Sequence, residues 1–131
     1  MPFIIQNEWF TKEQVYSSPG VTFVFGDNEQ RRGFGGQAKV CRGFPNTIGI
    51  RTKVAPTMRV EHLWYDKDCD EKAYLIDQDF WLVKDKLIDG ETIIYPADGV
   101  GTGMSCLHIN APLLLQHIEL WVEHLKEDYS E

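Results

Sequence analysis

Two glycine-rich segments, each following an apolar run, hold the residues best suited to binding a ligand in this sequence. The first, "FGDNEQRRGFGGQAK", covers residues 25–39, and the second, "YPADGVGTGM", covers residues 95–104. Glycine lacks the Cβ that would keep a ligand away from backbone N–H groups, and it adopts positive φ without strain. Where such a segment opens a helix, unpaired N–H groups and the helix dipole favour an anion. The two segments therefore indicate binding of a phosphate group.

Two such loops, at the carboxyl ends of neighbouring strands, could hold one diphosphate from both sides. We expect ligand contacts from Gly33, Phe34, Gly35, Gly36 and Gln37 in the first loop, and from Gly99, Val100, Gly101, Thr102, Gly103 and Met104 in the second. Neither loop has the spacing of a Walker A motif or of a dinucleotide-binding motif. Ordinary tight turns therefore remain the alternative explanation for each loop.

Basic residues around the first loop could add charge-assisted hydrogen bonds. Arg31 and Arg32 could each hold phosphate oxygens through two N–H donors, or could instead pair with Glu29 and solvent. Lys39 and Arg42 fall on the helix expected after the loop, where we favour a solvent-exposed face.

The histidines and cysteines give no pattern of a metal or redox site. The four histidines show no HExxH motif and no pair on a shared helical face. The three cysteines are an odd number without a CxxC pair, which argues against a disulfide framework and a structural zinc site. We expect buried, unreactive thiols at Cys41 and Cys106, no bound metal and no cofactor.

The composition is that of one globular domain covering residues 1–131, with 43% hydrophobic and 25% charged residues. The net charge of −7 argues against duplex nucleic acid, because that binding depends on many Lys and Arg contacts to phosphates. A small phosphorylated ligand needs only a local cluster of donors. The polar start of the chain and the lack of long apolar runs predict a cytoplasmic protein without a membrane partner. The oligomeric state is not indicated.

Strands alternate with helices along the chain, which predicts an α/β fold around a central sheet. Residues 73–77, "AYLID", look extended. The last of them, Asp77, is expected to cap the helix that follows. The expected strands lie within residues 3–10 and at 21–25, 46–52 and 91–96, and the expected helices lie at 11–16, 36–42, 77–87 and 114–125.

Residues 53–72, "KVAPTMRVEHLWYDKDCDEK", show no regular pattern, and a loop of this length is usually functional or mobile. An aromatic side chain there, Trp64 or Tyr65 beside His62, could stack on an adenine ring. The alternative, which we favour slightly, is that the loop folds its aromatic side chains under itself.

Three motifs together resemble the macrodomain-like superfamily, in particular its short bacterial and phage members. They are "FVFGDNEQRRGFGGQAK", "NTIGIRTK" and "IIYPADGVGTGMSCL", in this order. The resemblance implies a three-layer α/β/α sandwich with a central mixed sheet that binds ADP-ribose or a related cyclic or conjugated nucleotide. A phage-encoded member would act in the host cytoplasm, where it could sequester a nucleotide signal.

The resemblance also implies roles for single residues. Asp27 and Asn28, which follow Gly26, would hold adenine or ribose hydroxyls. Lys53 falls where some family members carry a lysine that attacks the ribose C1″. The aspartate that assists this lysine is replaced by Ser105, and Asp98 before the second loop is the substitute. We therefore expect a nucleotide-binding protein, with an ADP-ribosyl hydrolase using Lys53, Asp27 or Asp98, or a protein-interaction module, as alternatives.

Overall fold

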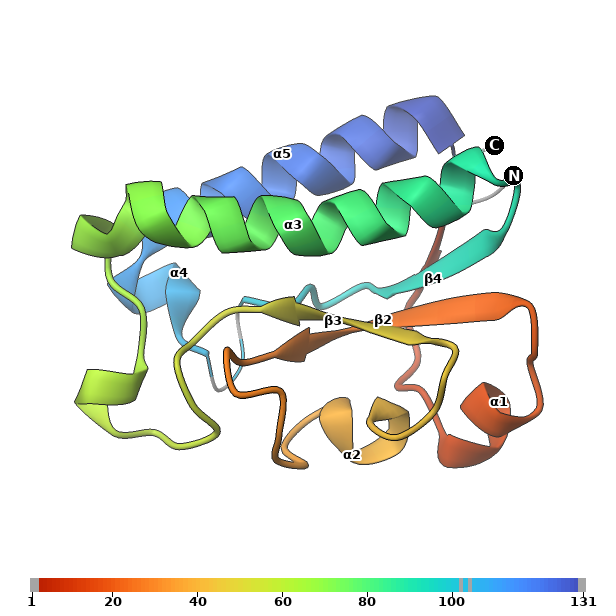
Figure 1. Ribbon diagram of the computed structural model, residues 1–131, viewed down its shortest axis with the longest axis horizontal. Helices are drawn as coiled ribbons and strands as arrows, with labels where there is room; N and C mark the ends of the chain where they lie inside the picture. Colours follow the sequence, from red (N-terminus) through yellow and green to blue (C-terminus); the bar gives the residue numbers. More distant parts are fainter. Residues whose placement is uncertain (1–2, 102, 104, 130–131) are drawn as a thin grey trace.

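The fold is built on a parallel β-sheet, seen in Figure 1. The computed structural model describes residues 3–101, 103 and 105–129. The sheet has four strands in the order β1-β4-β2-β3. The strands are β1 (Phe3–Gln6), β2 (Val21–Asp27), β3 (Thr47–Arg51) and β4 (Thr92–Pro96). The expected strands are therefore confirmed, with β2 two residues longer than predicted.

Each neighbouring pair of strands in this sheet is parallel. The expected mixed sheet is therefore wrong for the described strands. The reason lies in the connections, because each one carries a helix that returns the chain to the amino end of the sheet. Helix α1 links β1 to β2, α2 links β2 to β3, and α3 links β3 to β4. All four strands consequently end at the same edge.

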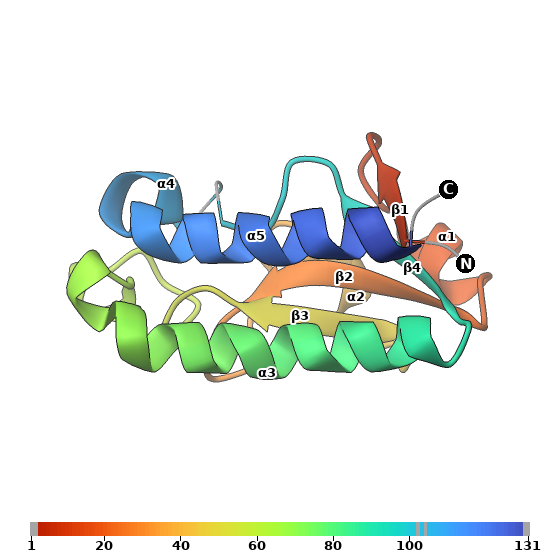
Figure 2. The same ribbon diagram turned by 90° about the horizontal axis from the view of Figure 1, so that it is seen from above.

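Helices lie on both faces of the sheet: α3 and α5 on one, α1 and α2 on the other (Figure 1). The view from above shows α3 and α5 running side by side (Figure 2). The helices are α1 (Lys12–Tyr16), α2 (Ala38–Cys41), α3 (Cys69–Ile88), α4 (Leu107–Asn110) and α5 (Pro112–Tyr129), with 3-10 turns at Val60–His62 and Asp66–Asp68. Among the described residues, no helix has the length and apolar character that crossing a bilayer requires.

Helix α3 begins eight residues earlier than the predicted helix, since it starts at Cys69 and not at Asp77. The expectation that residues 73–77 are extended is wrong. Ile76, Phe80, Val83 and Leu87 recur at helical spacing and are buried against the sheet. Asp70 and Glu71 of the first turn are exposed to solvent. Gly90 ends it with a positive φ, as the sequence indicates.

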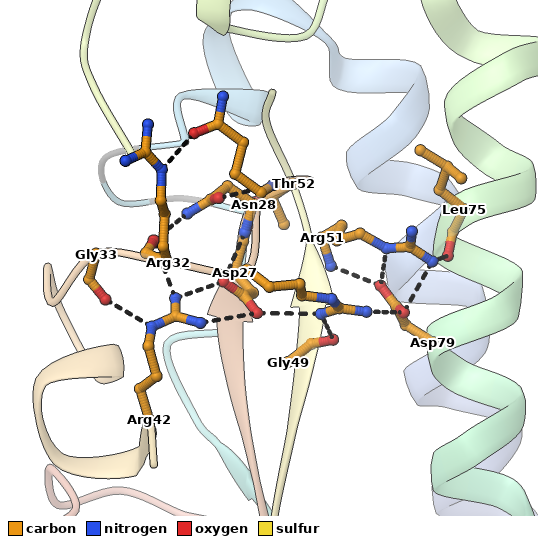
Figure 3. A network of polar contacts seen from close by, with 12 residues as sticks. Asp27, Asn28, Arg32, Gly33, Arg42, Gly49, Arg51, Thr52, Leu75 and Asp79 are labelled. Carbon is orange, nitrogen blue, oxygen red and sulfur yellow. Dashed lines mark hydrogen bonds and ion pairs between the residues drawn. The ribbon is translucent and has the colours of Figure 1, made fainter. Parts of the chain in front are cut away.

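A buried carboxylate joins α3 to the carboxyl end of the sheet (Figure 3). Asp79 of α3 is only 1% exposed. Its carboxylate accepts hydrogen bonds from the backbone N–H of Arg51 at 2.8 Å and from the Arg51 Nε at 3.0 Å. Arg31, beyond β2, donates to it from Nη2 at 2.6 Å. The Asp79 carboxylate thus fixes α3 to Arg31, which follows β2, and to Arg51, which ends β3.

We predict that Asp79→Ala lowers the free energy of unfolding by about 3 kcal/mol, because it leaves two arginines without their buried partner. The measurement is urea denaturation. Asp85→Ala, at an exposed position on the same helix, is the control and should change stability by less than about 0.5 kcal/mol. Equal effects of the two substitutions would contradict the role assigned to Asp79.

Candidate functional site

A pocket of about 460 Å³ lies at the carboxyl edge of the sheet. Because β2 and β4 pair directly, the glycine loops that follow them are neighbours. Both loops line this one pocket, together with Lys53 after β3 and Trp9 after β1. The expected convergence of the two loops is therefore present in the structure.

Most of the predicted ligand residues line this pocket. Phe34 does not, and its side chain is exposed. Gly101 does not either, because it packs against Leu107 and Leu115. Thr102 and Met104 lie outside the described residues. The predicted residues that line the pocket are Gly26, Asp27, Asn28, Arg32, Gly33, Gly35, Gly36, Gln37, Lys53, Asp98, Gly99, Val100 and Gly103.

The first loop leaves its backbone donors available. Within the described part of the chain, no backbone N–H group of residues 33–37 donates a hydrogen bond. Gly33 and Gly36 have φ of 95° and 55°, which explains the need for glycine at both positions. The helix that follows, α2, has only four residues. The donors of this loop are therefore individual amides, with little contribution from a helix dipole.

The second loop differs from the first. Gly99 has a φ of 78°, and its N–H donates to the carbonyl oxygen of Pro96 at 2.9 Å. That amide is already engaged. The N–H groups of Val100 and Gly103 have no acceptor among the residues that the structure describes. Among the described residues of the second loop, the N–H group already engaged is thus that of Gly99.

Arg42 holds the first loop in place, which corrects the expectation that it lies on a solvent-exposed face. Its side chain is 16% exposed. Its Nε donates to the carbonyl oxygen of Gly33 at 2.6 Å, and its Nη2 donates to the Asp27 Oδ1 at 2.6 Å and to the Arg32 carbonyl oxygen at 3.2 Å (Figure 3). The guanidinium therefore binds loop carbonyls while the loop N–H groups stay available.

Asp27 and Asn28 also stabilise the first loop through hydrogen bonds. The Asp27 carboxylate accepts hydrogen bonds from Arg42, from Arg31 and from the Asn28 backbone N–H. The Asn28 Nδ2 donates to the Arg32 carbonyl oxygen at 2.7 Å, and its Oδ1 accepts from the Gln30 N–H at 3.0 Å. Both residues line the pocket, so a contact to adenine or ribose stays a prediction. Their side chains already have partners in the protein.

The two arginines in the loop have different surroundings. Arg31 does not line the pocket, and it pairs with Asp27 and Asp79 and not with Glu29. These ion pairs hold a non-glycine residue at a φ of 55°. Arg32 lines the pocket and donates from its Nε to Gln30 at 2.6 Å. Arg32 is the arginine placed to meet an anion.

Lys53 lines the pocket and is 7% exposed. Its Nζ donates to the carbonyl oxygen of Thr57 at 3.3 Å. Burial lowers the pKa of Lys53, and the nearby Cys106 opposes this shift. Ser105 and Asp98 line the same pocket. Lys53 therefore shares one pocket with Ser105 and Asp98.

The long middle segment contributes less to the pocket than expected. Of residues 53–72, only Lys53 and Pro56 line it. A Cβ on Gly33 would lie 2.6 Å from the Pro56 Cβ, so the first loop packs directly on this segment. Trp64 is fully buried and donates from its Nε1 to Glu29 at 2.8 Å. The favoured alternative, that the segment covers its own aromatic side chains, is confirmed for Trp64.

The pocket is also lined by Trp9, Arg42 and Pro56, which no pattern in the sequence predicted as ligand contacts. Trp9 could have been found only from the strand order, since β1 lies next to β4.

Cys41 is buried as expected, and burial raises the pKa of its thiol to about 12. Cys106 is only partly buried. Among the described residues, no group of three or more His, Cys, Asp and Glu side chains could hold a metal ion.

Comparison with known proteins gives a family but no function. A family model described as "Family of unknown function (DUF7831)" matches residues 5–121. No curated protein and no solved structure matches the chain.

The lowered pKa of Lys53 predicts a pH-dependent contribution to stability. The unfolded chain holds the proton up to pH 10.5, whereas the folded chain releases it at lower pH. Between these two pKa values the unfolded state binds more protons, so stability rises with pH there. We expect the free energy of unfolding of the wild type, relative to Lys53→Met, to increase as pH rises toward 10.5 in urea denaturation. A constant or falling difference would contradict the burial effect.

Proposed function

We propose that this chain, which belongs to the DUF7831 family, binds a nucleotide of the ADP-ribose type. One observation carries the proposal: two glycine loops line one pocket, and the first of them leaves its N–H groups without protein acceptors in the described part of the chain. Backbone N–H groups bind phosphate well because they are donors fixed in direction. A diphosphate placed between the loops would satisfy them.

The charges around the pocket support an anionic ligand despite the net charge of −7. Arg32, Arg42 and Lys53 line it, against Asp27 and Asp98. Arg42 and Asp27 form an ion pair at 2.6 Å and largely offset each other. Arg32 and Lys53 remain as cationic groups that a phosphate could approach. Loss of water around Lys53 strengthens its attraction to an anion.

Gln37 supports a ligand that also carries hydrogen-bond donors. Its Oε1 is buried without a partner among the described residues, and Gln37 lines the pocket. Buried polar atoms nearly always have a partner, so a donor from the ligand is expected here. Phosphate oxygens only accept, whereas ribose hydroxyls and amino groups donate. A ligand with both sugar and phosphate fits this requirement, and the pocket volume is in the usual range for small-molecule sites.

The resemblance of the three motifs supports the choice of ADP-ribose among nucleotides. We propose a three-layer macrodomain-like sandwich, and the helices on both faces of the sheet are compatible with it (Figure 1). Cyclic or conjugated forms of ADP-ribose belong to the same ligand class. In a phage setting, tight binding without turnover would remove a nucleotide signal from the host cytoplasm.

One substitution in each loop tests this proposal. Gly35 does not have a positive φ, and a Cβ on Gly103 would meet no atom within 4 Å among the described residues. We predict that Gly35→Val and Gly103→Val each abolish the heat of ADP-ribose binding in calorimetry, because the side chain would occupy phosphate space. The melting temperature should shift by only a few degrees.

Asp85→Ala, which lies far along α3, serves as the control and should bind like the wild type. Unchanged affinity in a glycine variant would show that its loop does not hold the phosphate. If the wild type shows neither heat nor thermal shift with ADP-ribose, ADP or their cyclic relatives, the proposal fails and a protein-interaction module becomes the better explanation.

Lys53 supports a second candidate function, an ADP-ribosyl hydrolase. Burial lowers the pKa of the Lys53 amine, which favours the uncharged form that can act as a nucleophile. In that reaction the Nζ would attack the ribose C1″ and the bond to the modified macromolecule would break. Water would then attack the same C1″ and release ADP-ribose and the free lysine. The leaving group would need a proton from Asp98, since the macrodomain-like motif has Ser105 at the position of the acid and the Asp27 carboxylate is paired with Arg31 and Arg42.

We predict that the wild type leaves an ADP-ribosylated substrate intact, because serine at that position is a poor general acid. Long incubation followed by mass spectrometry is the measurement. Release of ADP-ribose by the wild type but not by Lys53→Ala would establish the hydrolase in place of simple binding.

A further inference from the structure

Trp9 is an exposed aromatic side chain at the rim of the pocket. It is 63% exposed and lines the pocket beyond the end of β1. Strand β4 lies next to β1, and the loop that follows β4 brings Asp98 and Gly99 to the same pocket. A large apolar ring left open beside a ligand pocket is a candidate surface for a planar group.

The backbone around Trp9 is held in place, so the position of the ring is not that of a loose terminus. Phe10, the next residue, is buried and packs on Phe23 with ring centroids 5.2 Å apart. The Gln6 Nε2 donates to the Glu8 carbonyl oxygen at 3.0 Å, and Gln6 pairs with Gln14 of α1 at 2.6 Å. Trp9 is thus fixed from both sides by residues that do not contact the pocket.

The strand order arranges the possible ligand contacts in a row. Across the sheet from β1 to β3, the carboxyl ends lead to Trp9, to the second glycine loop, to the first glycine loop and to Lys53. Strands lie about 4.8 Å apart, so the row spans about 14 Å. An aromatic surface stands at one end, phosphate-binding amides in the middle and a lysine at the other end.

We propose that Trp9 stacks on the base of the bound nucleotide and that the ligand lies across the strand ends in one direction. The base is at β1, the diphosphate is over the loops after β4 and β2, and the group beyond the diphosphate is at Lys53 after β3. This inference rests on the proposed function and adds a base-binding residue and a polarity to it. It also makes Trp9 a determinant of selectivity, because stacking would favour nucleotides over phosphates that have no base.

Calorimetry with ADP-ribose, ADP and inorganic pyrophosphate tests the stacking. Trp9→Ala should weaken binding of ADP-ribose and ADP about tenfold, the usual effect of losing one base–aromatic stack, and should leave pyrophosphate binding within about twofold. Trp9→Phe should keep most of the affinity, because it retains an aromatic face. Trp81→Ala, at a half-exposed tryptophan on α3, is the matched control and should bind like the wild type.

Fluorescence gives a second measurement. Addition of ADP should change the tryptophan emission of the wild type and of Trp81→Ala, but not that of Trp9→Ala, whereas pyrophosphate should leave all three nearly unchanged. If Trp9→Ala binds ADP-ribose like the wild type, the stacking is overturned while the proposed function stands. Equal weakening of ADP and pyrophosphate would overturn it too, by showing that Trp9 supports only the loops. If the wild type binds none of the three probes, both proposals fall.

Discussion

The direct parallel pairing of β2 with β4 is the constraint on which the site depends. Phe23 lies opposite Ile94 in this pair, and both strands run to the same edge. Paired strands are about 4.8 Å apart, so the segments that leave their carboxyl ends begin side by side. Antiparallel pairing would send the second glycine loop to the opposite edge of the sheet. The shared pocket therefore follows from strand direction before any side chain is considered.

A loop whose N–H groups face a ligand must be held in its conformation by other hydrogen bonds. Here these bonds are made to its carbonyl groups: Arg42 donates to the carbonyl oxygens of Gly33 and Arg32, and Asn28 donates to that of Arg32 as well. Asp27 holds the guanidinium of Arg42 in turn. The backbone donors are left over because only the acceptors are used. Buried charge at the strand ends thus has a structural role that fixes the loop while its N–H groups stay without protein acceptors in the described part of the chain.

Local features of the sequence predicted much of the fold. The apolar β-branched runs gave the strands, and the glycines marked the two loops. Helix α3 was predicted too short because the charged run "DKDCDE" shows no helical pattern of its own. The apolar face of the helix begins only at Ile76, and the packing of that face on the sheet is not visible in the sequence. Arg42 was assigned to solvent for a similar reason. A basic residue on a short helix is usually exposed, and its partner Asp27 lies 15 positions away in the sequence.

The sequence by itself determined which positions are glycine, which runs are apolar and where helices end, because these depend on φ and on neighbours a few residues away. Only the tertiary structure decided the strand order β1-β4-β2-β3, and with it the place of Trp9 beside the second loop. It also decided that Arg31 meets Asp79, 48 residues away. Such contacts depend on which surfaces are buried together, and burial is a property of the whole packed chain.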